Sequence, residues 1–470
     1  MLKITLRLLV WIAAIPLLAC GGKKEVPRVR PASIAPPAFW VWHRSSALKP
    51  AEMESLKEAR VHSLYWQVAE CDWANGGWRL NRIAAPMSGA ADLEIIPVFR
   101  IKPEPGFLGA PESADLLAKL VREWSGKTPA PTGIQLDFDC PDRLLPDYAR
   151  FLRAFGKAIS PAKVSITALA DWPKHPQFNT LANSVSSLAP MFYDLESDKA
   201  EDVRKSQFHP MAEISSVAKI KLWADCPRPW LAGLPNFDRL SIYEADGKLS
   251  GHLRGWEHDP VFFDPALKPR PLGTGTTVYE VETAVDFDGT RVSPGEKLVH
   301  RAPDALVLKE LTEAAKTAGA DGVVYFALPG PGIQAAFSPE HLGHLMDSTR
   351  STAAVEIGEK GSVILKNPGP ADLPARTCDP EQPASRGWQL ELKSDHAGAF
   401  RSASPGGFAE VEIPGGVPAE FSRTMVLHFS KLPAGKSIVS GSLIKDRTGL
   451  TWQIRSVTDN HLVNPNNSAR

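Results

Sequence analysis

The stretch Gly133-Ile134-Gln135-Leu136-Asp137-Phe138-Asp139 decides the fold, because it reads as one strand with an apolar and a polar face. Side chains alternate across a strand, so the three apolar residues share one face while Gln135, Asp137 and Asp139 share the other. The apolar face suits a layer of helices, and the polar face then points into a closed barrel. Asp139 lies nearest the C-terminal end of the strand, where barrel active sites are found.

Similar short runs, apolar, β-branched or aromatic, occur on both sides of this stretch and alternate with helical patterns. These runs are residues 39–43, 63–70, 93–101, 164–169, 185–194, 220–225 and 322–328. Helical spacing of apolar residues marks 113–125, 146–158 and 305–318. Eight strand and helix units predict an α/β fold, a (β/α)8 TIM-type barrel over residues 38–349. The alternative is an open doubly wound sheet, which is disfavoured because no glycine-rich phosphate loop follows the first strand.

Two regions depart from the alternation of strands and helices. Residues 240–300 contain hairpin-like pieces, with the turn dipeptide Asp288-Gly289, and predict a β-hairpin insertion after the seventh strand. Residues 350–470 contain short alternating strands separated by Gly, Pro, Asn and Asp, with no helix between them. This pattern predicts a small antiparallel β-sandwich domain.

Composition excludes several classes of function. The chain has 53 Lys and Arg against 53 Asp and Glu, so no net positive field attracts nucleic acid. With 43% hydrophobic residues, including 13 Trp and 19 Phe, the chain has enough apolar surface to fold. Its 42 prolines in 470 residues indicate ordered loops and rigid turns.

The first 19 residues predict a lipoprotein signal peptide. Lys3 and Arg7 precede an apolar run over 8–19, whose length of about 18 Å as a helix is too short to span a bilayer. The run ends in Leu17-Leu18-Ala19-Cys20-Gly21, which resembles the bacterial lipobox. Cys20 is then the lipidated first residue of the mature chain. The alternative is an ordinary signal peptide followed by a chance cysteine.

The segment after Cys20 predicts where the mature protein resides. Gly21, in place of Asp, indicates by the lipoprotein sorting rule an outer-membrane lipoprotein that faces the periplasm. Residues 20–37 are basic and then rich in Pro and Ala, which is typical of a tether. The membrane, reached through the lipid, is therefore one expected partner.

Cysteine and histidine spacing predicts no metal site, and no cofactor is expected. Cysteines 71, 140, 226 and 378 show no CxxC pattern. An oxidising periplasm permits disulfides among them, but the sequence cannot pair them. His209, His252 and His258 lie in predicted loops without ligand spacing, and His43 could at most orient an acid. No HExxH motif or serine elbow occurs.

Asp137 and Asp139 are the first candidate catalytic residues. Two carboxylates on one strand face bias each other's ionisation, so that one is charged and the other is kept protonated as an acid. The alternative is that they pair with Arg100 or His43 and only hold the mouth together. Tyr193 and Asp194 end the sixth predicted strand and complete the catalytic candidates.

Aromatic side chains supply the candidate substrate-binding residues. They fall at or just past predicted strand ends: Trp42, Trp66, Trp73, Trp172, Tyr193, Trp223 and Phe326. Flat rings suit the CH-rich faces of pyranose sugars. The polar residues that could read hydroxyls are Gln67, Glu70, Arg100, Gln135 and Asp225. The alternative is that some rings plug the barrel or pack under loops, as Trp40 and Trp66 could.

Two resemblances follow from these motifs. Leu136-Asp137-Phe138-Asp139 resembles the fourth-strand signature of family-18 chitinases, and Pro190-Met191-Phe192-Tyr193-Asp194 is similar to their sixth-strand motif. Those enzymes carry a Glu proton donor two residues beyond the second aspartate, where this chain has Pro141. Asp142 follows one step out of phase. The chain after the tether also resembles an uncharacterised bacterial family, domain of unknown function 3142, which implies no established activity.

Three hypotheses for function remain open. The first is a lipid-anchored, glycoside hydrolase-like enzyme acting on a polysaccharide or cell-envelope glycan. The second is a catalytically degenerate glycan-binding or envelope-assembly lipoprotein, as Pro141 suggests. The third is a scaffold that docks another envelope protein through the C-terminal sandwich.

Overall fold

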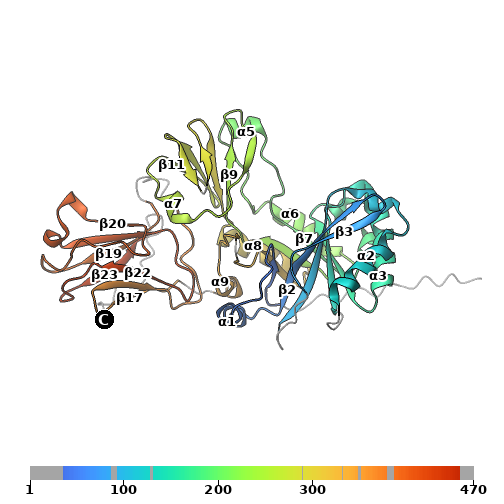
Figure 1. Cartoon of the computed structure of the whole chain (residues 1–470), viewed down its shortest axis with the longest axis horizontal. Coiled ribbons are helices and arrows are strands. Elements are labelled where there is room, and N and C mark those ends of the chain that lie inside the picture. The colour runs from blue at the N-terminus through green and yellow to red at the C-terminus, as the bar shows by residue number, and fades with distance from the viewer. Residues whose placement is uncertain are drawn as a thin grey trace, which may run out of the picture.

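The computed structural model describes residues 35–85, 93–126, 131–287, 289–330, 332–347, 351–377 and 386–455. The molecule is elongated, with the barrel at one end, an antiparallel insertion in the middle and the C-terminal sheets at the other end (Figure 1). The predicted signal peptide, Cys20, Cys378 and all but the last three residues of the tether lie outside the described residues. In the described part of the chain, no helix combines the length and the apolar character needed to cross a bilayer.

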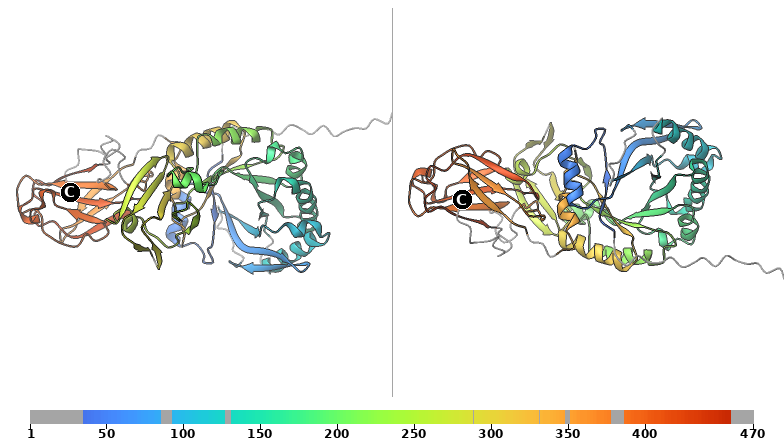
Figure 2. Two further views of the ribbon diagram at one scale, coloured as in Figure 1. Left: turned by 90° about the horizontal axis from the view of Figure 1, so that it is seen from above. Right: turned by 90° about the horizontal axis from the view of Figure 1, so that it is seen from below.

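Eight parallel strands close into the predicted barrel, because β1 pairs with both β16 and β2. Around the barrel they are β1 (Ala38–Val41), β2 (Ser63–Ala74), β4 (Glu94–Ile101), β5 (Gly133–Asp137), β6 (Lys163–Leu169), β7 (Ser187–Met191), β8 (Leu231–Pro235) and β16 (Gly322–Phe326). The closed order confirms the (β/α)8 prediction. The views from above and below show the helices outside this ring (Figure 2).

The helices follow the barrel strands with one exception. They are α1 (Pro50–Glu58), α2 (Ser113–Ser125), α3 (Leu145–Ile159), α4 (Phe178–Ala182), α5 (Ala200–Arg204), α6 (Ser216–Lys221), α8 (Ala305–Thr317) and α9 (Pro339–Gly343). After β2 the described chain forms a hairpin with β3 (Gly77–Arg82) instead. Asn75 and Gly76 make this turn with φ of 51° and 72°, a conformation that favours these two residue types.

Alternation along the strands separates two cores. The outer core lies between strands and helices and contains Ile134, Leu136 and Phe138, as expected for the apolar face of β5. The inner core fills the barrel, with Trp40, Tyr65, Val98 and Val324 among its members. Trp40 is 1% exposed and its Nε1 donates to Gln135 Oε1 at 2.7 Å. An indole plug therefore occupies the barrel, and its polar atom is satisfied by the polar face of β5.

The seventh strand is the one barrel element that was predicted at the wrong place. Residues 220–225 are helical, at the end of α6 and in a 3-10 helix (Leu222–Asp225), and the seventh strand is β8. Leu231-Ala232-Gly233-Leu234-Pro235 is short and ends in proline, which weakens its sequence signal. β8 nevertheless completes the ring, since it pairs with both β7 and β16.

The insertion after the seventh strand is larger than a hairpin. It contains β9 (Arg239–Tyr243), β10 (Leu249–His252), β11 (Leu267–Gly273), β12 (Thr276–Val281) and β15 (Lys297–Arg301) in one antiparallel sheet, the ribbon of β13 (Val285–Phe287) and β14 (Thr290–Val292), and α7 (His258–Phe262). The ribbon is the predicted hairpin, although Asp288 at its turn lies outside the described residues. Val203 of α5 and Phe208, which follows α5, pack on one face of the sheet.

Two antiparallel sheets form the C-terminal region, as predicted. One contains β17 (Ala354–Ile357), β18 (Ser362–Lys366) and β22 (Ser437–Ser442), and the other β20 (Glu410–Glu412), β21 (Thr424–Phe429), β19 (Trp388–Lys393) and β23 (Thr451–Arg455). Apolar residues of both sheets form a single buried core. Arg386 joins this region to the insertion, since its guanidinium donates to the carbonyls of Phe262, Asp264 and Leu267.

The indole plug makes a prediction about Gly233 on β8. A Cβ at this residue would lie 2.9 Å from the carbonyl oxygen of Pro190 and 3.0 Å from the Trp40 ring. Both neighbours are held by the barrel, so Gly233→Ala should lower the free energy of unfolding by about 1–3 kcal/mol in urea denaturation. Gly77→Ala is the control, because a Cβ there meets no heavy atom within 4 Å. Equal stability of the two variants would contradict the packing described.

Candidate active site

Three charged residues form a row across the C-terminal mouth of the barrel. Arg100 on β4 is in register with Glu70 on β2 and with Asp137 on β5. Its guanidinium lies 3.8 Å from Glu70 Oε1 and 3.8 Å from Asp137 Oδ2. Two strand spacings separate the outer members, about 9.5 Å between their Cα atoms. The mouth therefore holds one cation with one carboxyl group on each side of it.

Asp137 occupies the inner end of this mouth. Its side chain is 15% exposed, and Thr167 Oγ1 on β6 donates to its Oδ1 at 2.7 Å. Burial raises the pKa of Asp137 to about 6, with the hydrogen bond from Thr167 opposing the rise and the charge of Asp139 adding to it. This carboxyl is thus still protonated in part of the population near neutral pH.

Asp139 follows the strand and reaches solvent. Burial also raises the pKa of Asp139, and the charge of Arg100 opposes the rise. Pro141 is two residues beyond Asp139 and precedes a 3-10 helix (Asp142–Leu144), in which Asp142 is exposed. Asp137 and Asp139 thus lie at the mouth with Arg100, and Pro141 stands at the position of the acid in the motif that the sequence resembles.

Tyr193 follows β7, two strands around the barrel from β5, and lies near both acids. Burial raises the pKa of Tyr193, and the charges of Asp137, Asp194 and Asp139 raise it further. Its ring stacks on Phe326 with centroids 6.1 Å apart. Asp194 has a different environment, because Arg239 donates to both of its carboxylate oxygens at 2.5 and 2.7 Å. This bidentate pair joins the sixth barrel strand to the insertion and holds Asp194 as a structural group.

A cavity of about 460 Å³ opens at the same end of the barrel, past the ends of β1, β8 and β16. Its aromatic walls are Trp42, Phe237, Trp256 and Phe326, and its polar walls include His43, Arg254, Glu257 and Gln334. Phe326 connects it to the acids through the stack on Tyr193. His43 connects it to the charged row, since Glu70 and Arg100 both influence the pKa of His43, which burial lowers. The volume lies within the range of about 300–1,000 Å³ typical of small-molecule sites.

Three tryptophans predicted to bind substrate do not reach the mouth. Trp66, Trp172 and Trp223 are fully buried in the outer core. Trp66 lies on the outward face of β2, with its Nε1 bonded to the carbonyl of Arg44. Trp223 lies on the misassigned helical segment and donates to the carbonyl of Ala170. Trp66 lies within β2 and Trp172 follows β6, and the side on which each ring points depends on register and loop path.

Two glutamines and one aspartate that were predicted to bind substrate also lie elsewhere. Gln135 is 1% exposed and holds Trp40, so it supports the plug and cannot reach a ligand. Gln67 is fully buried inside the barrel and accepts from the backbone N–H of His43. Asp225 is exposed at the end of the 3-10 helix after α6, outside the barrel strands. Of the predicted substrate-binding residues, Trp42 and Phe326 line the cavity and Arg100 lies beside Asp137.

Several mouth residues had no clear sequence signal. Phe237 is the second residue after β8, so correct placement of the seventh strand would have predicted Phe237 at the mouth. Arg254, Trp256 and Glu257 come from the insertion, whose path over the mouth is set by the tertiary fold. Thr167 could have been found from alternation on β6, since it faces the same interior as Asp137.

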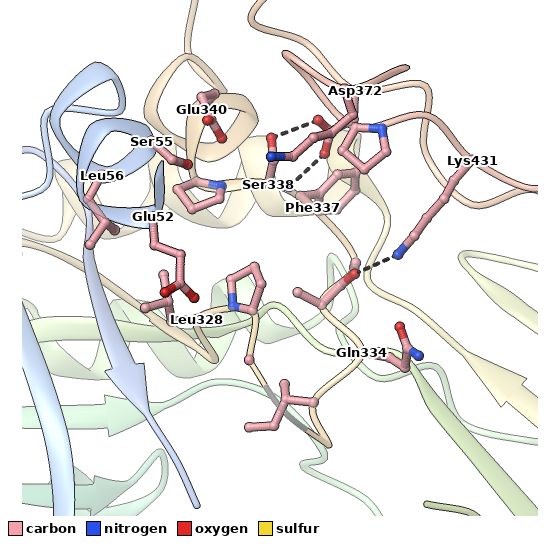
Figure 3. A pocket seen from close by; sticks show the side chains of 18 of the residues that line it. Glu52, Ser55, Leu56, Leu328, Gln334, Phe337, Ser338, Glu340, Asp372 and Lys431 are labelled. Carbon is pink, nitrogen blue, oxygen red and sulfur yellow. Dashed lines mark hydrogen bonds between the residues drawn. The ribbon is translucent and has the colours of Figure 1, made fainter. Parts of the chain in front are cut away.

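A second cavity of about 340 Å³ lies between α1, α9 and the C-terminal region. Figure 3 shows Ser338 bonded to Asp372 and Lys431 reaching the backbone across it. Asp372 accepts from the backbone N–H and hydroxyl of Ser338 and from the N–H of Ala434. Glu52 is held by Arg44 at 2.7 Å. These polar groups are satisfied within the protein, so this cavity is a junction between the barrel and the C-terminal sheets.

Part of the mouth lies within a segment that a family model matches. Residues 94–251 match the family model "Domain of unknown function (DUF3142)". The predicted resemblance to this family is therefore confirmed over that range. The DUF3142 segment runs from β4 to β10 and includes Arg100, Asp137, Asp139 and Tyr193. Among curated proteins, none matches the chain significantly.

Solved structures similar to this chain include glycan-degrading enzymes. The spore cortex-lytic enzyme SleL of Bacillus megaterium is 12% identical, with a TM-score of 0.44 over 67% of this chain and 74% of its own. Chitinase ChiA74 from Bacillus thuringiensis is 10% identical, with a TM-score of 0.43 over 87% of this chain and 98% of its own. The strand order itself establishes the barrel, and nothing about activity follows from likenesses this distant.

The raised pKa of Asp137 predicts a pH-dependent effect of its removal. The ionised carboxyl is disfavoured in the folded chain, so its cost is present above about pH 6 and disappears as the pH falls towards 4. Asp137→Asn should therefore raise the free energy of unfolding at pH 7.5, by up to roughly 3 kcal/mol. The gain should shrink steadily below pH 6 in urea titrations. Asp225→Asn, at an exposed residue, should show no such trend, and a pH-independent effect at Asp137 would contradict the assignment.

Proposed function

We propose that the barrel acts on carbohydrate as a glycoside hydrolase-like enzyme. The observation that carries the proposal is the Asp137 carboxyl, with a pKa of about 6, at a mouth that adjoins an aromatic-walled cavity. Aromatic walls with polar groups between them suit the faces and hydroxyls of pyranose rings. A carboxyl that keeps its proton near neutral pH suits protonation of a glycosidic oxygen.

The two aspartates would divide the work. Asp137 would hold the proton and donate it to the leaving oxygen, because burial favours its neutral form. Asp139 reaches solvent and would act as the second carboxylate, as a base or as a stabilising charge. Asp139 follows Asp137 by two residues and its charge raises the pKa of Asp137, so the two carboxyl groups lie near each other. Glycoside hydrolysis uses a pair of carboxyl groups of this kind. Tyr193, which lies near both acids, would orient the sugar.

The substrate class and location follow from the sequence. A lipoprotein signal peptide and Cys20 support attachment to the outer membrane, facing the periplasm. A polysaccharide or cell-envelope glycan is the carbohydrate available there. The predicted partners are therefore a glycan ligand and the membrane, with an envelope protein as a further partner of the C-terminal sheets.

Pro141 favours a second function, glycan binding without cleavage. It occupies the position of the chitinase proton donor, and a proline side chain cannot exchange a proton. The lining of the 460 Å³ cavity includes neither Asp137 nor Asp139, so a sugar could bind there without contacting either acid. A non-catalytic protein would use Trp42 and Phe326 alone.

Matched variants separate the two functions. The purified chain is incubated with peptidoglycan and with chitin oligosaccharides, and products and binding are both measured. Cleavage by the wild type should fall at least a hundredfold in Asp137→Asn and Asp139→Asn, with binding retained. Trp42→Ala should weaken binding by about tenfold, and Asp225→Asn should change neither. Binding without product would support the second function, and the absence of binding to any glycan would refute both.

Lipid attachment has its own test. Cells expressing the full chain are labelled with radioactive palmitate, and the protein is recovered from membrane fractions. We expect label on the wild type and none on Cys20→Ser, because the cysteine sulfur is the site of lipid attachment. Cys71→Ser is the control. Label on Cys20→Ser would contradict the proposed anchor.

A further inference from the structure

Asp238, His258 and His300 meet in a buried cluster behind the wall of the mouth cavity. Asp238 lies between β8 and β9, His258 begins α7, and His300 is on β15. Their side chains are 0%, 5% and 4% exposed. One potential ligand atom from each residue lies within 4.8 Å of the others. The fold thus collects two imidazoles and one carboxylate from sequence positions up to 62 residues apart (300 − 238).

Hydrogen bonding within the cluster is incomplete. His258 Nε2 lies 2.5 Å from Asp238 Oδ2, but His300 Nε2 is 3.8 Å from the same oxygen, which is too far for a hydrogen bond. Asp238 Oδ1 and His300 Nε2 have no hydrogen-bond partner among the described residues, although both are buried. A buried polar atom without a partner carries a desolvation cost. A ligand that accepts both lone pairs would remove this cost.

Aromatic rings enclose the cluster. Trp256 lies with its ring centroid 4.9 Å from that of His258 and 5.6 Å from that of His300. Phe262 packs against both imidazoles from another side, at 5.3 and 5.1 Å. Gln334 supports the arrangement. Its backbone carbonyl accepts from the backbone N–H of Asp238, and its side-chain amide donates to the backbone carbonyl of Trp256. Polar ligand atoms inside an apolar shell are typical of metal sites.

We propose that Asp238, His258 and His300 bind a divalent transition metal ion of the zinc type. Imidazole nitrogen and carboxylate oxygen are the donors that Zn²⁺ and its neighbours prefer, whereas Mg²⁺ and Ca²⁺ take oxygen ligands. Ligand atoms of a tetrahedral Zn²⁺ site are about 3.3 Å apart, so side-chain shifts of roughly 1 Å convert the cluster into this geometry. Three protein ligands leave a fourth position for water or for a group from the cavity.

The metal would join the insertion to the barrel. Asp238 lies in the link that leaves the barrel strand β8, three residues after its end, while both histidines lie further along the insertion. Arg254, Trp256 and Glu257, which line the mouth cavity, immediately precede His258. The ion would therefore fix the wall of the cavity. The proposal does not depend on the activity proposed above.

A titration of the wild-type chain tests the proposal. The full chain is purified without a polyhistidine tag, stripped with EDTA and titrated with Zn²⁺, with Co²⁺ and, as a negative control, with Mg²⁺. We expect one equivalent of Zn²⁺ to bind, Co²⁺ to give the visible absorption of a four-coordinate site, and X-ray absorption of the Zn²⁺ complex to show two imidazole ligands. Zn²⁺ should also raise the Tm.

Variants locate the ion. Asp238→Asn and His300→Gln should weaken Zn²⁺ binding on the order of a hundredfold or more. His252→Gln is the matched control, because His252 lies on β10 of the same sheet and bonds to Ser241, outside the cluster. No stoichiometric binding by the wild type would overturn the proposal. Unchanged binding by both cluster variants would overturn it too, and the wild-type titration decides the question even where a variant fails to fold.

Discussion

The structure depends on how the inside of an eight-stranded parallel barrel is filled. Trp40 occupies this interior, lies against Gly233, and places its one polar hydrogen on Gln135. A buried indole with a satisfied N–H closes the lower barrel, so polar side chains further along the strands are displaced to the C-terminal mouth. Asp137 is the next inward residue after Gln135 on the same strand. The plug is thus held by the residue that precedes Asp137 on the inward face of β5, and burial raises the pKa of Asp137.

Most of the fold could be predicted from the sequence, because the barrel strands are short apolar runs and the helices show a clear period. The helix at residues 113–125 was predicted at the bounds that the structure has. The seventh strand was missed because helical residues 220–225 are as apolar as a strand, whereas β8 ends in proline. The extent of the insertion was underestimated, since the pairing of β9 with β15 joins residues far apart in the chain.

The candidate site could be predicted only for residues whose side-chain direction follows from alternation along a strand. Asp137 faces inward because it is in phase with Gln135, and Arg100 joins it by register. The direction of Trp66 was predicted wrongly, because a place within an apolar run does not reveal which side of β2 a residue occupies. Asp238, His258 and His300 carry no recognisable spacing, as 20 and 42 residues separate them (258 − 238 and 300 − 258). Their meeting is a property of the tertiary fold.

The ionisation of Asp137 is the property on which the account of the site depends. Carbon-13 NMR of the side-chain carboxyl of Asp137, followed through a pH titration of the folded chain and assigned with Asp137→Asn, measures its pKa directly. The account predicts a pKa of about 6, set chiefly by burial. A pKa close to the ordinary value of 3.8 would show a solvated carboxylate held by Arg100, and would contradict the proposed proton donor.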